Sequence, residues 1–229
     1  MMKVGPAHLA QSPLFDGVPS EGVEIAEQAL RMLVFEPGQT VFEAGDRGHA
    51  LYLIESGRVK ISHTNLDDRE KVLAYLNAGE VFGEMSLVDD APRSATATVV
   101  EPAVIHALYL EEYWGLVRRF PQVAHNLARI IAHRLREMNH EVEVLTFEEA
   151  RGKVAYALLK LYRHRYGEAT PRGRRMPLTH REVADLAGTS RETATRVLGQ
   201  FIEMGLVGSG SRAIEVLDPA GLENVLYDL

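Results

Sequence analysis

Two clusters of residues in this chain combine the side-chain types and the spacing that anion binding requires. The first cluster consists of Gly83, Glu84, Met85, Ser86, Arg93, Ser94 and Ala95. A glycine lets the backbone approach a ligand closely, and a helical turn that starts after it offers free N–H groups to an anion. Arg93 can pair bidentately with a phosphate, to which Ser94 can also donate, and Glu84 can accept from a sugar hydroxyl. A cyclic nucleotide would meet all of these groups at once; the alternative is a structural ion pair between Glu84 and Arg93 beside an empty pocket.

The second cluster, residues 178–207, has the pattern of two short helices joined by a tight turn. Thr179 followed by Glu182 is a capping box that begins the first helix, and Gly188 suits the left-handed residue that ends it. Ser190 can cap the second helix, whose apolar face would be Ala194, Val197, Leu198 and Phe201. Two such helices form a helix-turn-helix, and the second would lie in the major groove of DNA.

The second helix of this motif carries side chains that can read bases. Arg191 and Arg196 can each form paired hydrogen bonds with guanine, and Glu192 can accept from N4 of cytosine. The alternative is a solvated, charged helix face. The complete DNA-contacting set that we predict, including phosphate contacts, is Thr179, Ser190, Arg191, Glu192, Thr193, Arg196 and Arg212.

A short β-hairpin is expected directly after the helix-turn-helix. Residues 208–211 are alternating Gly and Ser and link two apolar runs, Leu206–Val207 and Ile214 to Val216. This pattern indicates a two-stranded wing with Arg212 near its tip. A plain surface hairpin is the alternative.

One long helix is predicted over residues 121–146, because neither glycine nor proline follows Pro121, which suits a first turn. Apolar side chains recur along it at alternating spacings of four and three residues, an a/d seam of about three heptads. We therefore expect pairing with the same helix of a second chain, with packing on its own domain as the alternative. The expected dimer-interface residues are Ala128, Ile131, Leu135, Met138, Val142 and Leu145.

The remaining segments define the fold class. Residues 35–110 contain short β-branched and aromatic runs, with Gly38, Gly45, Gly57 and Gly79 expected in the turns between them. Many short strands of this kind favour a barrel or sandwich. Residues 152–165 predict a second amphipathic helix, and the Gly-, Pro- and Arg-rich residues 166–177 predict a loop. The predicted class is α+β.

Composition excludes several kinds of protein. The chain has 229 residues, 46% of them hydrophobic, so it can build more than one core. No run is apolar for long enough to span a bilayer, the N-terminal stretch is not expected to be a signal peptide, and a cytoplasmic location is expected. The absence of cysteine excludes disulfides, thiolate metal sites and iron–sulfur clusters. Without a Walker loop, nucleophile elbow or HExxH motif, we expect no enzyme, no catalytic residues and no metal site.

Charge is divided unevenly along the chain. Residues 1–150 carry 13 Lys and Arg against 23 Asp and Glu, a net charge of −10, whereas residues 151–229 carry 12 against 9, a net charge of +3. An acidic front half and a basic back half indicate two tasks, of which the second involves an anion such as DNA.

The motifs together resemble the CRP/FNR family of transcription regulators, in particular its cyclic-AMP-responsive branch, over about residues 14–217. The segments FGEMSL and APRSATA match its phosphate-binding cassette, and SRETATR matches its recognition helix, in the right order around a long helix. The resemblance implies a jelly-roll-like, cyclic-nucleotide-binding β-roll over residues 1–120. It further implies a dimerisation helix and hinge over residues 121–147 and a winged helix-turn-helix over residues 148–229.

The resemblance also implies site residues and ligands. Gly83, Glu84, Arg93 and Ser94 match the residues that bind cyclic AMP, the expected allosteric effector, and no cofactor is required. The three base-reading residues of the family match Arg191, Glu192 and Arg196, which implies an inverted repeat resembling TGTGA…TCACA. The expected partners are therefore palindromic double-stranded DNA, a cyclic nucleotide, RNA polymerase and a second copy of the chain, with no membrane.

Three positions of the effector site depart from the family pattern. Arg134, Met138 and Asn139 complete the predicted site from the long helix, where cyclic-AMP-binding members place adjacent hydroxyl residues against adenine. Asn139 can still hydrogen-bond adenine, but Met138 cannot donate, and a pocket-lining serine is replaced by Ala74. The effector is therefore cyclic AMP, another ligand or none, and a cyclic-nucleotide-binding regulatory subunit without DNA binding is the alternative from another class.

Overall fold

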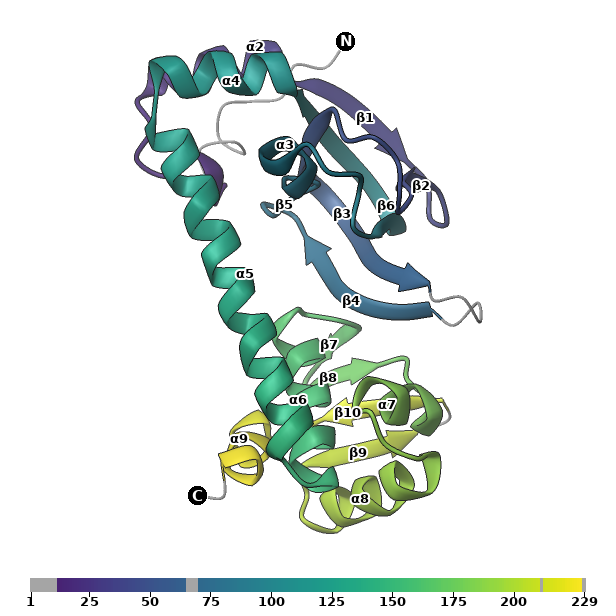
Figure 1. The fold of residues 1–229 in the computed structure, drawn as a ribbon. Helices are drawn as coiled ribbons and strands as arrows, with labels where there is room; N and C mark the ends of the chain where they lie inside the picture. Colours follow the sequence, from purple (N-terminus) through teal and green to yellow (C-terminus); the bar gives the residue numbers. More distant parts are fainter. Residues whose placement is uncertain (1–11, 65–69, 211, 228–229) are drawn as a thin grey trace. The chain divides into compact units, whose positions relative to one another are not determined.

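The computed structural model describes residues 12–64, 70–210 and 212–227, which form two compact units, 1–135 and 136–229 (Figure 1). The N-terminal stretch in which we expected no signal peptide lies mostly outside these residues. The first unit begins with η1 (Pro13–Phe15) and α2 (Ser20–Ala29). Its strands are β1 (Arg31–Phe35), β2 (Thr40–Phe42), β3 (Ala50–Thr64), β4 (Glu70–Asn77), β5 (Val81–Phe82) and β6 (Thr96–Tyr109). Its other helices are α3 (Met85–Asp89), α4 (Leu110–Arg119) and the start of α5 (Gln122–Phe147).

The strands of the first unit form one antiparallel sheet in the order β1-β6-β3-β4, with β2 paired to β6 and β5 paired to β3. One face of this sheet packs with η1, α2, α4 and α5 around Leu51, Leu108 and Leu127. A second core, inside the curved sheet, is built around Ile54, Phe82 and Ile105. The predicted α+β class, with an N-terminal β-domain ahead of a long helix, is confirmed.

The expected turn at Gly57 is wrong, because this glycine lies inside the continuous strand β3. The pairing with β6 shifts register before it (Ile54/Ser56), across it (Ser56/Arg58) and after it (Arg58/Val59). Its backbone has φ +87°, and an added Cβ would approach the Pro102 carbonyl oxygen to 2.3 Å. Gly57 therefore bends a long strand at a β-bulge instead of ending it.

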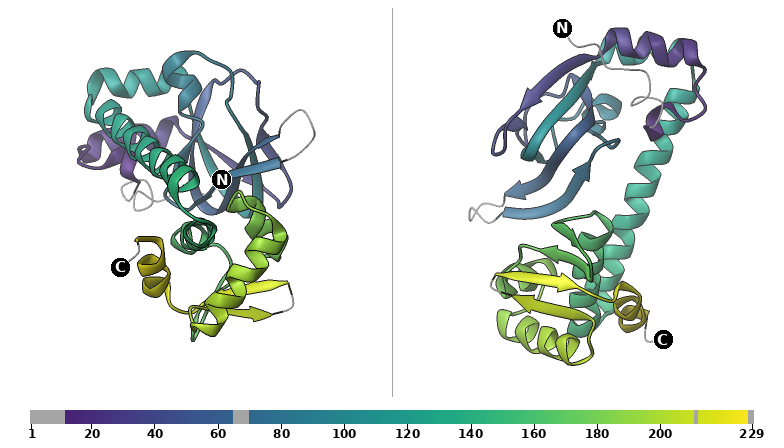
Figure 2. Two further views of the ribbon diagram at one scale, coloured as in Figure 1. Left: turned by 60° about the horizontal axis from the view of Figure 1, so that its bottom comes forward. Right: turned by 180° about the vertical axis from the view of Figure 1, so that it is seen from behind.

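The second unit is helical around a small sheet (Figure 2). It contains the end of α5, then α6 (Ala150–Arg163), α7 (His180–Leu186), α8 (Arg191–Glu203) and α9 (Pro219–Tyr227). Its strands are β7 (Glu168–Thr170), β8 (Gly173–Met176), β9 (Val207–Gly210) and β10 (Ala213–Val216), in the order β7-β8-β10-β9. Helices α6, α7 and α8 pack on one another, and α9 packs on α6.

The expected loop over residues 166–177 is also wrong, because it contains the hairpin of β7 and β8. The Thr170 hydroxyl accepts hydrogen bonds from the N–H groups of Arg172 and Gly173, at 3.3 and 3.1 Å, and closes the turn. Met176, Arg175 and Arg174 then pair with β10. Glycine and proline at the turn hid two short strands that are stabilised by the sheet they join.

The predicted helices occur with small shifts at their ends. The long helix begins and ends one residue later than the predicted 121–146, and α6 begins and ends two residues earlier than the predicted 152–165.

Candidate functional site

The predicted phosphate-binding cluster centres on a turn between β5 and α3. Gly83 occupies this turn with φ +74°, a conformation that side chains other than glycine rarely adopt. An added Cβ would lie 2.7 Å from Nη1 of Arg93 and 3.2 and 3.3 Å from the rings of Tyr52 and Phe42. The structure therefore requires glycine here both for the backbone and for the approach of the arginine.

Arg93 is buried, with 5% of its surface exposed, and backbone carbonyls hold its guanidinium. Nη1 donates to the Gly83 carbonyl at 2.5 Å and lies 3.4 Å from the Ser86 hydroxyl, while Nη2 donates to the Ala50 carbonyl at 2.7 Å. Both terminal nitrogens are thus engaged by the protein. These bonds use three of the five N–H groups of the guanidinium, and the bidentate phosphate pairing expected from the sequence stays a prediction for the edge formed by Nε and Nη2.

The Nε–H of Arg93 is a donor that a ligand can use. It is buried and has no hydrogen-bond acceptor among the described residues. No described carboxylate forms an ion pair with Arg93, so the Glu84–Arg93 pair considered above as an alternative does not occur. Such a buried cation, with an unpaired N–H and no carboxylate partner, can bind an anionic oxygen of a ligand.

Aromatic rings surround the guanidinium. The Arg93 Cζ lies 4.2 Å from the ring centroid of Phe42 and 5.5 Å from that of Tyr52. Burial lowers the pKa of the Arg93 guanidinium and raises the pKa of the Tyr52 phenol, while the attraction between the two groups opposes both shifts. Water is therefore largely excluded from this cation, which strengthens its attraction for an anion.

Glu84 pairs with the long helix. Its Oε1 accepts from Nη1 of Arg134 at 2.7 Å, and Nη2 of the same arginine donates to the Val81 carbonyl. The Glu84 side chain is buried, whereas that of Arg134 is 28% exposed. This contact brings together two residues predicted to bind the effector and ties α5 to the cassette.

The remaining predicted effector residues do not contact Arg93 and Arg134 as one group. Ser86 and Ala95 are buried, and the exposed Ser94 hydroxyl contacts the Met85 sulfur at 3.6 Å. Met138 and Asn139 belong to the second unit, and both side chains are exposed. The structure thus joins the cassette with Arg134 inside the first unit.

The sequence analysis missed the residues that hold Arg93. Phe42 and Tyr52 are separated from it by tens of residues, and Ala50 acts through a backbone carbonyl that no sequence pattern reveals. Gly48 is the fourth residue of this group. An added Cβ there would lie 2.3 Å from Cβ of Ser86 and 3.0 Å from Cζ of Arg93, so the arginine packs directly against the backbone of this glycine. Phe42 and Tyr52 are single aromatic residues on different strands, so no local pattern marked them.

The helix-turn-helix has the caps that were predicted. Thr179 and Glu182 form a capping box at α7, with Thr179 N–H donating to Glu182 at 2.7 Å. Ser190 caps α8 by accepting from the Thr193 N–H at 3.1 Å, and Gly188 has φ +60° between the helices. His180 of α7 lies 3.1 Å from the Thr195 hydroxyl of α8, which adds a side-chain contact to the packed helix pair.

The outer face of α8 presents the predicted base-reading residues. Ala194, Val197, Leu198 and Phe201 are buried, as expected for the inner face. Arg191, Glu192 and Arg196 are all exposed, and none forms an ion pair with another described residue. The hydroxyls of Ser190 and Thr193 are engaged with each other at 3.0 Å within the cap.

The wing consists of β9 and β10, in which Ala213 pairs with Gly210. The two-residue connection contains Arg212, which is exposed and has φ +53°, and Ser211, which lies outside the described residues. From the neighbouring strand β8, Arg175 reaches toward this tip, with Nη2 3.6 Å from the position of a Cβ on Gly210. Basic side chains from two hairpins thus gather at one end of the sheet.

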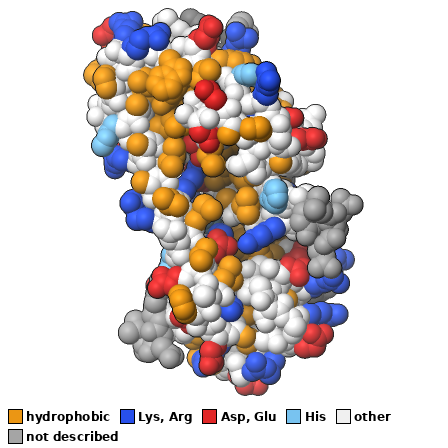
Figure 3. Space-filling model, viewed as in Figure 1, with side chains coloured by type: hydrophobic (Ala, Val, Ile, Leu, Met, Phe, Trp, Pro, Cys, Tyr) orange, Lys and Arg blue, Asp and Glu red, His pale blue; other side chains and the backbone are white. Residues whose placement is uncertain are grey.

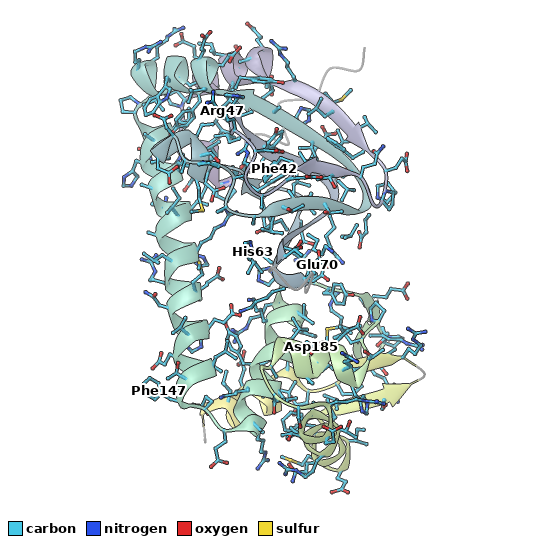
Figure 4. All side chains as sticks on the ribbon, turned by 45° about the vertical axis from the view of Figure 1, so that its right-hand side comes forward. Phe42, Arg47, His63, Glu70, Phe147 and Asp185 are labelled. Carbon is cyan, nitrogen blue, oxygen red and sulfur yellow. The ribbon has the colours of Figure 1, made fainter. Side chains whose placement is uncertain are left out.

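The apolar seam of α5 is largely exposed in the single chain. Leu135, Met138 and Val142 are 56%, 63% and 64% exposed, and hydrophobic side chains reach the surface along this helix in Figure 3. Ala128 is exposed, whereas Ile131 is partly buried against the core of the first unit. Leu145 is also partly buried and lies near Gly188 in the second unit. Phe147, at the end of α5, is 81% exposed (Figure 4).

The described residues contain no group of three or more His, Asp or Glu side chains placed to hold a metal ion. None of their helices is long and apolar enough to cross a membrane.

Both candidate sites lie in domains that match known protein families. The family described as the cyclic nucleotide-binding domain matches residues 32–120, and the Crp-like helix-turn-helix domain matches residues 152–225. The cyclic AMP receptor protein of Thermus thermophilus is 46% identical over 218 residues, 95% of this chain and 98% of that protein. The CRP-like cAMP-activated global transcriptional regulator of Mycobacterium tuberculosis is 32% identical over 214 residues, 92% of this chain and 94% of that protein.

Solved structures agree with these relatives. The crystal structure of Thermus thermophilus catabolite activator protein is 46% identical, with a TM-score of 0.56, covering 95% of this chain and 100% of that one. The c-di-GMP responsive global regulator CLP of Xanthomonas campestris shares the fold, at 24% identity and a TM-score of 0.71, covering 86% of this chain and 99% of that one. With two matching domains and relatives that align along almost their whole length, the chain belongs to the CRP/FNR family of transcription regulators and not to a class of enzymes.

Proposed function

We propose that this protein is a homodimeric transcription factor that binds cyclic AMP in its β-roll and then recognises a TGTGA-type inverted repeat. The coarser statement, a cyclic-nucleotide-responsive regulator of the CRP family, follows from its two domains and its relatives. The observation that carries the finer proposal is the buried Arg93, whose Nε–H lacks an acceptor among the described residues, beside the Gly83 turn. The relatives named for cyclic AMP support this choice of effector.

In this proposal each polar group of the cassette has one task. The Nε–H of Arg93 and the Ser94 hydroxyl donate to the cyclic phosphate, and backbone N–H groups at the start of α3 assist. The hydrogen bond from Arg134 uses Oε1 of Glu84, so Oε2 accepts from the ribose hydroxyl. Met138 and Asn139 face the adenine, with Asn139 supplying the hydrogen bond.

The effector acts by shifting the population of two dimer states. The exposed Leu135, Met138 and Val142 form the seam between the two copies of α5, and effector binding extends this pairing toward the hinge at residues 146–148. The functional division is a β-roll over residues 1–120, a dimerisation helix and hinge over residues 121–147, and a DNA-binding domain over residues 148–229. The factor works in the cytoplasm and acts on RNA polymerase.

DNA reading relies on α8. Arg191 and Arg196 bind guanines and Glu192 binds a cytosine, while Thr179, Ser190, Thr193 and Arg212 contact phosphates. Two copies of α8 would read half-sites about one helical turn apart. The exposure of the three base-reading side chains supports this assignment.

The test is a fluorescence-anisotropy titration of a TGTGA…TCACA duplex and a scrambled duplex at one salt concentration, because affinity for DNA depends steeply on salt. Cyclic AMP, cyclic GMP and cyclic di-GMP are added in separate arms. Tight, sequence-specific binding only with cyclic AMP is the expected result. Equal binding without any nucleotide would retain the DNA reader and remove the switch, and a response to another nucleotide alone would replace the effector.

A further inference from the structure

Hydrogen bonds to backbone carbonyls, and no ion pair among the described residues, hold the Arg93 side chain in place. Its two terminal nitrogens donate to carbonyls from two separate segments, Ala50 at the start of β3 and Gly83 after β5. These two bonds fix the guanidinium within its own plane. Two such bonds still allow the plane to tilt about the line that joins their two acceptors.

A ring face supplies the missing constraint. The guanidinium carbon lies over the Phe42 ring at 4.2 Å, closer than the 5.5 Å to Tyr52. Planar guanidinium groups stack on aromatic faces, and the attraction increases when water is excluded. The Phe42 ring thus lies directly against the buried cation.

Phe42 is itself held in place. It lies on β2 among the strands of the β-domain (Figure 4), 5.6 Å from the Tyr52 ring and 5.8 Å from the Phe82 ring. Tyr52 and Phe82 stack on each other at 5.2 Å, and Phe82 is fully buried. A rigid aromatic group therefore supports the ring that supports the arginine.

We propose that Phe42 is a positioning residue of the effector site, whose ring orients Arg93 so that its Nε–H is presented to the phosphate of the cyclic nucleotide. This inference rests on the proposed function. Because the phosphate is common to all cyclic nucleotides, Phe42 affects the affinity for each of them and not the choice between bases. Loss of the ring leaves Arg93 charged and buried but free to tilt.

The test compares Phe42→Leu, which removes the ring, with Phe42→Tyr, which keeps it. Calorimetric titration uses whichever of cyclic AMP, cyclic GMP and cyclic di-GMP binds the wild-type chain most tightly. Phe42→Leu is expected to weaken binding about five- to tenfold, in line with a desolvated cation–π contact. Phe42→Tyr is expected to stay within about twofold of wild type, since its ring has the same face.

Two further variants separate positioning from packing. Phe35→Leu is the matched control, because Phe35 packs on the same core as Phe42 but has no ring contact with Arg93. It should lower the thermal unfolding temperature as Phe42→Leu does and leave the affinity unchanged. In an Arg93→Gln background, Phe42→Leu should have almost no further effect, which is the coupling expected when Phe42 acts through the arginine.

Equal losses of affinity for Phe35→Leu and Phe42→Leu, or an undiminished effect of Phe42→Leu in the Arg93→Gln background, would overturn the inference and leave the proposed function intact. Failure of the wild-type chain to bind any of the three nucleotides would overturn both.

Discussion

Replacing Gly83 by alanine tests the geometry of the effector site most directly. Two effects are combined at this position. The left-handed backbone strains any residue with a Cβ, at about 1–2 kcal/mol. The new Cβ would also lie 2.7 Å from Nη1 of Arg93, which must then move although it is hydrogen-bonded to the Gly83 carbonyl. Losing a hydrogen bond of a buried charged group costs about a further 1.5–3 kcal/mol.

Gly79→Ala is the matched control. Gly79 has φ +89°, but an added Cβ would meet nothing within 4 Å, so this variant carries the backbone strain alone. In chemical denaturation, Gly79→Ala should lower the free energy of unfolding by about 1–2 kcal/mol and Gly83→Ala by about 2.5–5 kcal/mol. Only the latter displaces the arginine.

Calorimetric titration of both variants with cyclic AMP then isolates the effect of the close approach between Gly83 and Arg93. Gly79→Ala should bind within about twofold of wild type, and Gly83→Ala should bind at least about tenfold more weakly, since 1.4 kcal/mol corresponds to a factor of ten. Equal affinities of Gly79→Ala and Gly83→Ala for cyclic AMP would refute the inference that glycine at position 83 is needed to place the Arg93 side chain.

Three further outcomes are expected. Glu192→Ala should remove roughly 1–3 kcal/mol of discrimination at one base pair in anisotropy titrations, whereas Glu203→Ala, at the far end of α8, should not; equal losses on specific and random DNA would assign Glu192 a different role. Leu135→Asp should convert the dimer to a folded monomer in sedimentation and abolish specific DNA binding, because this side chain is 56% exposed in the single chain; a persisting dimer would contradict the seam. Arg134→Met should lower the free energy of unfolding by about 1–3 kcal/mol, because the buried Glu84 carboxylate loses its cationic partner. Adding Glu84→Gln should restore most of the lost stability. If the double variant is as unstable as Arg134→Met, the ion pair does not stabilise the fold.

Local chemistry made the helical parts of the fold predictable. The capping box at Thr179, the cap at Ser190 and the left-handed Gly188 each depend on residues within a few positions, and all three were identified from the sequence. The long helix was predictable for the same reason, because its period extends over seven turns without interruption.

Features that depend on distant parts of the chain were not predictable. Gly57 looks like a turn residue, and only its pairing with β6 makes it a bulge within one strand. The short β7 and β8 exist because β10 offers a partner. Arg93 was identified as a phosphate-binding residue, but its ring contact with Phe42 and its bond to the Ala50 carbonyl arise from tertiary packing.

The place of β10 in its sheet bears on the entropy of DNA binding. Because β8 and β9 flank it, the wing is not an isolated two-stranded hairpin, which would be marginally stable in water. The strands that carry Arg212 are ordered before DNA arrives, so binding has to immobilise mainly the side chain, at about 0.5–1.5 kcal/mol. If the wing contacts phosphate as proposed, it does so with little loss of freedom in its strands, and its contribution to affinity should appear chiefly as a slower dissociation of the complex.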